Sequence, residues 1–116
     1  MSSRIVMRRY ARLKQVHCIK RTSEEEAIRY QDFNNQCAYC GATEKLSLDH
    51  FLPIAHGGAD TISNLVPACM PCNVRKNAQD PKLWYQAQDF YSLKNWKKIL
   101  KVLGKTDANY LQIPLL

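Results

Sequence analysis

Four of the five cysteines in this 116-residue sequence fall into two Cys-x-x-Cys pairs, Cys37 with Cys40 and Cys69 with Cys72. Two such pairs can supply four thiolates to one tetrahedral ion, so we predict a structural Zn²⁺ site. A redox pair would need only one of these motifs. The odd cysteine count and the expected lack of an export signal argue against a disulfide framework. Cys18 is expected to be a small buried residue or a free thiol rather than a fifth ligand.

An acid, a histidine and an asparagine that could form a second site lie between and beside the cysteine pairs. Asp49 and His50 end the alternating stretch LSLDH, and Asn73 directly follows a predicted zinc ligand. Carboxylate and amide oxygens suit Mg²⁺ or Mn²⁺, and a histidine titrates near working pH, as a general base requires. Two alternatives stay open: Asp49 and His50 could be a buried pair without chemistry, and Asn64 and Asn73 could be caps.

One geometric condition applies to the acid–histidine pair. Adjacent residues of a strand point to opposite faces, so Asp49 and His50 can serve one site only if the strand ends or bulges at them.

The stretch DHFLPIAHGGADTISNLVPACMPCNVRK, together with the first cysteine pair, resembles the HNH endonuclease family, also called the ββα-metal or His-Me finger family. The resemblance covers about residues 37–77, and the order and spacing of its elements make it specific. It implies a β-hairpin packed on a helix, one catalytic divalent metal between them, and cleavage of DNA phosphodiesters.

The resemblance also implies roles for individual residues. His50 corresponds to the general base, and Asn64 to the residue that braces the loop and orients the base. Asp49 and Asn73 correspond to ligands of the catalytic Mg²⁺ or Mn²⁺. At the last position the name-giving motif has His, whereas this chain has Asn73, which keeps an oxygen ligand. Asn77, four residues further along the expected helix, is a weaker candidate ligand.

Three further residues are secondary candidates. Arg75 and Lys76 are candidate phosphate contacts, and Lys76 could instead be a solvated helix residue. His56, before two glycines, is expected to be a loop residue that could contact phosphate.

Positive charge is concentrated at the start of the chain. Residues 1–22 contain seven basic residues and no acid, while residues 23–116 contain ten of each sign. Such a basic arm indicates a polyanionic partner, most simply DNA, although a solvated helix face or a mitochondrial-type targeting segment would look similar. The candidate DNA contacts in the arm are Arg4, Arg8, Arg9, Arg12 and Lys14.

No apolar run in the sequence approaches the roughly 20 residues of a membrane span, and the basic start lacks the apolar block of a secretory signal. We expect no membrane partner and an intracellular, cytoplasmic location, and the sequence leaves monomer and homodimer open.

The elements that must position these residues can be outlined from their patterns. We expect a strand over residues 45–51, a loop at Gly57–Gly58, and a short helical or extended segment over 61–65. A helix should begin at Pro71 and end by residue 79 or 80. Ser23 and Glu26 predict a capping box for a helix over 23–33. Further helices are expected over 81–91 and 93–103, with Gly104 as the stop.

Together these elements predict an α+β fold: a small ββα-metal finger stapled by a four-cysteine zinc site, with helices flanking it on its N- and C-terminal sides. We divide the chain into a basic arm (1–22), a zinc-stabilised nuclease core (23–79) and a C-terminal helical extension (80–116) within one compact domain.

The expected function is hydrolysis of DNA phosphodiester bonds by a metal-dependent endonuclease, giving 5′-phosphate and 3′-hydroxyl ends. The alternatives are a zinc-stabilised DNA-binding module without activity, and a nuclease subunit active only within a larger complex.

Overall fold

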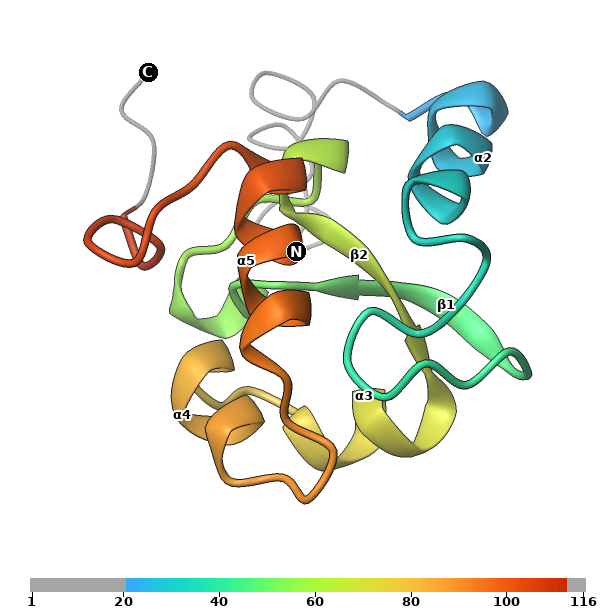
Figure 1. Ribbon diagram of the computed structural model, residues 1–116. Coiled ribbons are helices and arrows are strands. Elements are labelled where there is room, and N and C mark those ends of the chain that lie inside the picture. The colour runs from blue at the N-terminus through green and yellow to red at the C-terminus, as the bar shows by residue number, and fades with distance from the viewer. Residues whose placement is uncertain (1–20, 113–116) are drawn as a thin grey trace.

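The computed structural model describes residues 21–112, so the predictions for Cys18 and for the DNA contacts of the basic arm lie outside the described residues. The described part is a small α+β structure (Figure 1). Its helices and strands, in chain order, are α2 (Ser23–Asp32), β1 (Leu46–His50), η1 (Ile54–His56), η2 (Ile62–Asn64), β2 (Leu65–Cys69), α3 (Met70–Lys76), α4 (Pro81–Gln86) and α5 (Leu93–Leu103).

The centre of the fold is an antiparallel hairpin of β1 and β2, in which Leu46 lies opposite Cys69 and His50 opposite Leu65. Every residue of β2 is buried. Residue patterns alone did not predict β2, because a strand buried on both faces shows no apolar–polar alternation and Pro67 argues against a strand. Only the family resemblance implied it. Pro67 is tolerated because the sheet has only two strands, so a residue of β2 whose backbone polar atoms face away from β1 loses no ladder hydrogen bond. The Pro67 carbonyl bonds on that outer side, to the Ala38 amide at 2.9 Å.

Helix α3 follows β2 without a loop, and Cys69 is its N-cap. It ends at Lys76, within the predicted limit of residue 79 or 80, so Asn77 lies just outside the helix that was expected to carry it. The helix ends at Asn77 because its backbone, with φ of 48° and ψ of −127°, lies outside the helical region. This early end matters for the site, because residues after Lys76 no longer follow the helical spacing.

Helix α2 precedes the first cysteine pair. Its capping box joins Thr22 to Glu25, one residue earlier than the predicted Ser23 and Glu26. Arg29 on α2 donates hydrogen bonds to the carbonyls of Ile62 and Leu65, both at 2.5 Å. These bonds attach α2 to the segment that leads into β2.

The C-terminal helices pack on the hairpin and close the core. Helix α4 ends at Gln86 rather than at residue 91, whereas α5 has the predicted bounds and ends at Gly104, which has a φ of 69°. Trp96 packs beside Phe51 just after β1, and the Tyr85 hydroxyl donates to the Tyr39 carbonyl at 2.9 Å. The extension and the cysteine-bearing segment therefore share one hydrophobic core.

The expected fold class is confirmed: a two-stranded antiparallel sheet followed by a helix, flanked by helices on both sides in the chain, with the cysteines gathered at one place. Within residues 21–112, none of the helices combines the length and the apolar character that crossing a membrane requires.

Candidate active site and metal centre

The four predicted zinc ligands come together at one end of the hairpin. Cys37 and Cys40 lie in the turn after α2, Cys69 ends β2, and Cys72 lies in the first turn of α3. All four sulfur atoms lie within 4.8 Å of one another, and Cys40 Sγ is 3.6 Å from Cys69 Sγ. A tetrahedral site with zinc–sulfur bonds of 2.3 Å has sulfur atoms about 3.8 Å apart. The prediction that these cysteines are positioned to bind one metal ion is confirmed.

The electrostatics of the cluster also fit a cation. A hydrogen bond from the Cys72 thiol lowers the pKa of Cys37 to about 4, and the same contact raises the pKa of Cys72. The first thiolate therefore opposes ionisation of its neighbours. A divalent cation removes this conflict, because it stabilises several thiolates at once.

Asp49 is almost enclosed on the face of β1 that α3 covers. Its Oδ2 accepts a hydrogen bond from the Tyr39 hydroxyl at 3.1 Å and lies 3.2 Å from Lys76 Nζ. Burial raises the pKa of Asp49, while Lys76 acts in the opposite direction. The Asp49 carboxylate is thus held in a fixed position by two neighbours.

Lys76 is fully buried, with 0% of its surface exposed. Its ammonium group donates to the His50 carbonyl at 2.9 Å in addition to its contact with Asp49, and burial lowers its pKa. Lys76 was expected either to contact phosphate or to be a solvated residue of the helix. Its complete burial fits neither expectation. Lys76 instead joins α3 to the end of β1.

Asn73 lies on the same side of the hairpin as Asp49. Its Nδ2 donates to Ser47 Oγ at 3.4 Å, and Ser47 shares a strand face with Asp49 because it lies two residues away. The two predicted oxygen ligands, Asp49 and Asn73, therefore lie on the same face of β1. Asn77, in contrast, is exposed and follows the end of α3, so the helical offset that suggested it does not apply.

His50 points to a different set of neighbours. Its Nε2 lies 2.9 Å from Asp60 Oδ1, and Arg21 donates to the same oxygen at 2.8 Å. His50 is also the last residue of β1, so the geometric condition set by the sequence, a strand end at this pair, is met.

Sequence reasoning missed Asp60 as a partner of His50. The available signal was weak: an acid two residues after Gly57–Gly58, in the loop that follows the histidine. Only the path of this loop brings the carboxylate back to His50.

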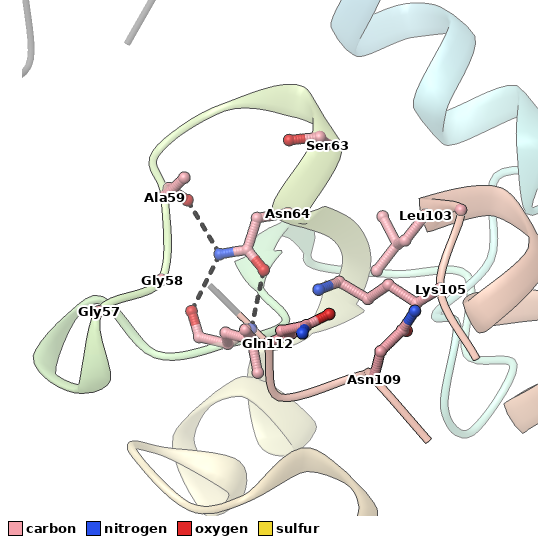
Figure 2. Close-up of a pocket in the computed structure, with 11 residues that line it drawn as sticks. Gly57, Gly58, Ala59, Ser63, Asn64, Leu103, Lys105, Asn109 and Gln112 are labelled. Atoms are coloured by element: carbon pink, nitrogen blue, oxygen red, sulfur yellow. Dashed lines mark hydrogen bonds between the residues drawn. The ribbon is translucent and has the colours of Figure 1, made fainter. Parts of the chain in front are cut away.

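Asn64 is buried and holds that loop from inside (Figure 2). Its Oδ1 accepts from the Leu52 amide, and its Nδ2 donates to the carbonyls of Leu52 and Ala59, each at 2.9 Å. Gly58 passes so close that an added Cβ would lie 1.9 Å from the Leu52 carbonyl oxygen. The segment from residue 52 to residue 64 is therefore closed into a fixed loop beside His50.

A pocket of about 450 Å³ lies over this loop, between Asn64 and the residues after α5 (Figure 2). Lys105, Asn109 and Gln112 line it from the C-terminal side. The other secondary candidates, His56 and Arg75, are exposed on η1 and α3.

Comparison with known proteins agrees with this architecture. Residues 37–79 match the family model described as HNH endonuclease, and this part of the chain is an HNH endonuclease domain. The chain is also similar to a Bacillus subtilis protein named "SPbeta prophage-derived putative HNH endonuclease YoqL", with 35% identity over 68 residues. That match covers 49% of this chain and spans 30% of the relative's length.

Proposed function

We propose that the protein is a metal-dependent endonuclease that hydrolyses DNA phosphodiester bonds to 5′-phosphate and 3′-hydroxyl ends. The observation that carries the proposal is the placement of Asn73 on the Asp49 face of β1, at the strand end formed by His50. This arrangement lies within the HNH endonuclease domain and combines oxygen donors with an imidazole.

Asp49 and Asn73 are the residues that would hold the catalytic Mg²⁺ or Mn²⁺. Their carboxylate and amide oxygens are the donors that these ions prefer. Lys76 and Tyr39 approach Asp49 through Oδ2, and a carboxylate has about four lone-pair positions on its two oxygens, so capacity for a metal ion is left. When bound, the ion would stabilise negative charge that develops on the phosphate.

His50 would act as the general base that takes a proton from the attacking water. A carboxylate only accepts hydrogen bonds, so Nε2 of His50 carries the proton that Asp60 accepts. The neutral ring then has its lone pair on Nδ1, where the water's proton is received. The resulting hydroxide attacks phosphorus in line, the bond from phosphorus to the 3′ oxygen breaks, and that oxygen takes up a proton from solvent to give the 3′-hydroxyl. The positive charge on the ring is stabilised by Asp60.

Asp60 and Asn64 are positioning residues in this proposal. Asp60 orients the imidazole, and Arg21 orients Asp60 by donating to the same oxygen. Asn64 fixes the loop that carries Asp60 through its three hydrogen bonds to the backbone of Leu52 and Ala59.

The four cysteines would bind Zn²⁺ in a structural role. They join the turn after α2, the end of β2 and the start of α3, which are the segments that set the position of Asn73. With four thiolate ligands the ion has no open position for substrate.

The decisive experiment is incubation of the purified chain with supercoiled plasmid, with and without Mg²⁺ or Mn²⁺, followed by analysis of the end groups. Metal-dependent nicking that leaves 5′-phosphate ends, and that His50→Ala removes, supports the proposal. DNA binding without cleavage under any metal condition contradicts it and favours a binding module.

The second candidate is a nuclease subunit that is active only within a larger complex. Cleavage by the isolated chain would contradict this candidate.

A further inference from the structure

Helix α5 carries a row of lysines on the face that points away from the core. Lys94, Lys97, Lys98 and Lys101 are spaced by three, one and three residues, which places them on one side of a helix. The opposite side consists of buried residues, namely Trp96, Ile99, Leu100 and Leu103. We call these four lysines the lysine ridge.

The ridge has little acidic counter-charge within the described part of the chain: Asp107 interacts with Lys97 but forms its ion pair with Lys82. No ion pair joins a ridge lysine to a carboxylate among residues 21–112. The ridge lines a hollow of about 650 Å³, and the one acid in that lining, Asp32, already pairs with Arg29 at 3.2 Å. The hollow is therefore a strongly positive surface.

The HNH endonuclease domain carries no net positive charge of its own. Residues 37–79 contain three basic and three acidic residues, so their formal charge is zero. One of the three basic residues is Lys76, which is fully buried beside Asp49. The net positive charge of the chain, which attracts a polyanion, is therefore supplied by residues outside the domain.

We propose that the lysine ridge of α5 is a second DNA-binding surface, which holds the phosphates of the duplex that the active site cuts. The choice of DNA rests on the proposed function, whereas the choice of a polyanion rests on the ridge itself. Seven residues of helix span about 10 Å, which covers roughly three successive phosphates of one strand.

Helix α2 connects the ridge to the active site. Arg21, just before α2, contacts Asp60 beside His50, and Asp32 at the other end of α2 lines the hollow of the ridge. A helix of ten residues is about 15 Å long, so the two places are separated by roughly four to five base pairs of duplex. The separation of the two places is therefore short compared with the length of a bound duplex.

The test is the salt dependence of binding of a fluorescent duplex oligonucleotide, measured by anisotropy in a His50→Ala background so that the DNA is not cut. Three ridge residues are changed together, Lys94→Gln, Lys97→Gln and Lys101→Gln. Lys98 is kept because its ammonium group lies over the Phe33 ring, 5.3 Å from the centroid. The matched control changes the same three lysines to arginine, which preserves the charge.

Each phosphate contact contributes about 0.9 to the slope of log K against log salt concentration. We expect the glutamine variant to bind more weakly, with a slope flatter by about 2 to 3, and the arginine variant to bind like the parent. An unchanged slope in the glutamine variant would overturn the proposal, as would equal losses in both variants. If the triple glutamine variant melts at a lower temperature, Lys94→Gln with Lys101→Gln is measured instead, with an expected flattening of about 2.

This measurement is independent of cleavage. A chain that binds through the ridge but does not nick plasmid, with His50 restored, contradicts the proposed function and supports the ridge. Conversely, the chain could nick plasmid while the glutamine variant keeps the salt slope of the parent. That result would support the proposed function and contradict the ridge as a DNA-binding surface.

Discussion

His50 Nε2 lies 2.9 Å from Asp60 Oδ1, although the two residues belong to different segments, the end of β1 and the loop before η2. This contact sets which ring nitrogen carries the proton and which is left to accept one. We predict that Asp60→Asn lowers kcat of plasmid nicking by up to about 10²-fold, because the amide can turn its donor group towards the ring.

Two readouts separate this positioning role from a structural one. In ¹⁵N NMR spectra of the imidazole, the wild type should show protonated Nε2, and Asp60→Asn should shift the tautomer towards Nδ1–H. Asp60→Glu is expected to recover part of the activity. A wild-type tautomer ratio in Asp60→Asn would show that Asp60 does not orient His50.

The two kinds of active-site residue should respond differently to metal. His50→Ala should reduce the cleavage rate by about 10²–10⁴, with unchanged zinc content, melting temperature and DNA affinity, because a general base acts mainly in the transition state. Asn73→Ala removes an oxygen ligand, so raising the Mn²⁺ concentration should partly restore its activity but not that of His50→Ala. Equal responses of the two variants to Mn²⁺ would mean that these roles are wrongly assigned.

The Asp49–Lys76 pair should be important for stability as well as for the site. Lys76→Met leaves Asp49 buried without its cation, and breaking a buried pair typically costs about 3–5 kcal/mol of unfolding free energy. Arg75→Met, one position earlier on the exposed face of α3, is the matched control and should change stability by less than about 0.5 kcal/mol. Urea denaturation measures both, and similar midpoints for the two variants would contradict the importance of the pair.

Removal of zinc should unfold the HNH endonuclease domain. We expect one zinc per chain by elemental analysis, and we expect Cys69→Ser or a strong chelator to remove the near-UV signal of the core, because the site joins three separate segments. Cys18→Ser, outside the two pairs, should leave zinc content and melting unchanged. A folded, active and zinc-free preparation would refute the structural role.

Asn64→Ala should loosen the loop that carries Asp60. The substitution removes three hydrogen bonds and leaves the Leu52 amide without its partner, which costs about 1–3 kcal/mol for a buried group. Activity should fall between that of the wild type and that of His50→Ala, because the base is displaced but not removed. Asn109→Ala, across the pocket of Figure 2, serves as a control and should have little effect. If Asn64→Ala has wild-type stability and rate, the loop is held by other contacts.

Much of the framework could be predicted because its signals are local. Each Cys-x-x-Cys pair places two sulfur atoms within one turn, so four thiols in two pairs indicate one metal site before any fold is known. The C-terminal stop of α5 at Gly104 is likewise a property of one residue and its conformation. The sequence showed only that Asp49 and His50 could serve one site if the strand ended or bulged at them. In the structure, β1 ends at His50.

Other features were decided by contacts between distant segments. Strand β2 is buried on both faces, so no alternation could reveal it. The sequence pattern of α3 would allow Lys76 to be a surface residue, and it gives no sign that the helix lies against β1. In the structure, the Lys76 ammonium group contacts Asp49 and the His50 carbonyl. Asp60 is the partner of His50 because the loop between them, held by Asn64, returns to the end of β1. The cysteine cluster and the proposed proton-transfer residue could be predicted from the sequence, because they depend on side-chain chemistry and short spacings. The tertiary structure alone decided which charges face each other, because burial and pairing depend on how the hairpin, the loop and α3 pack together.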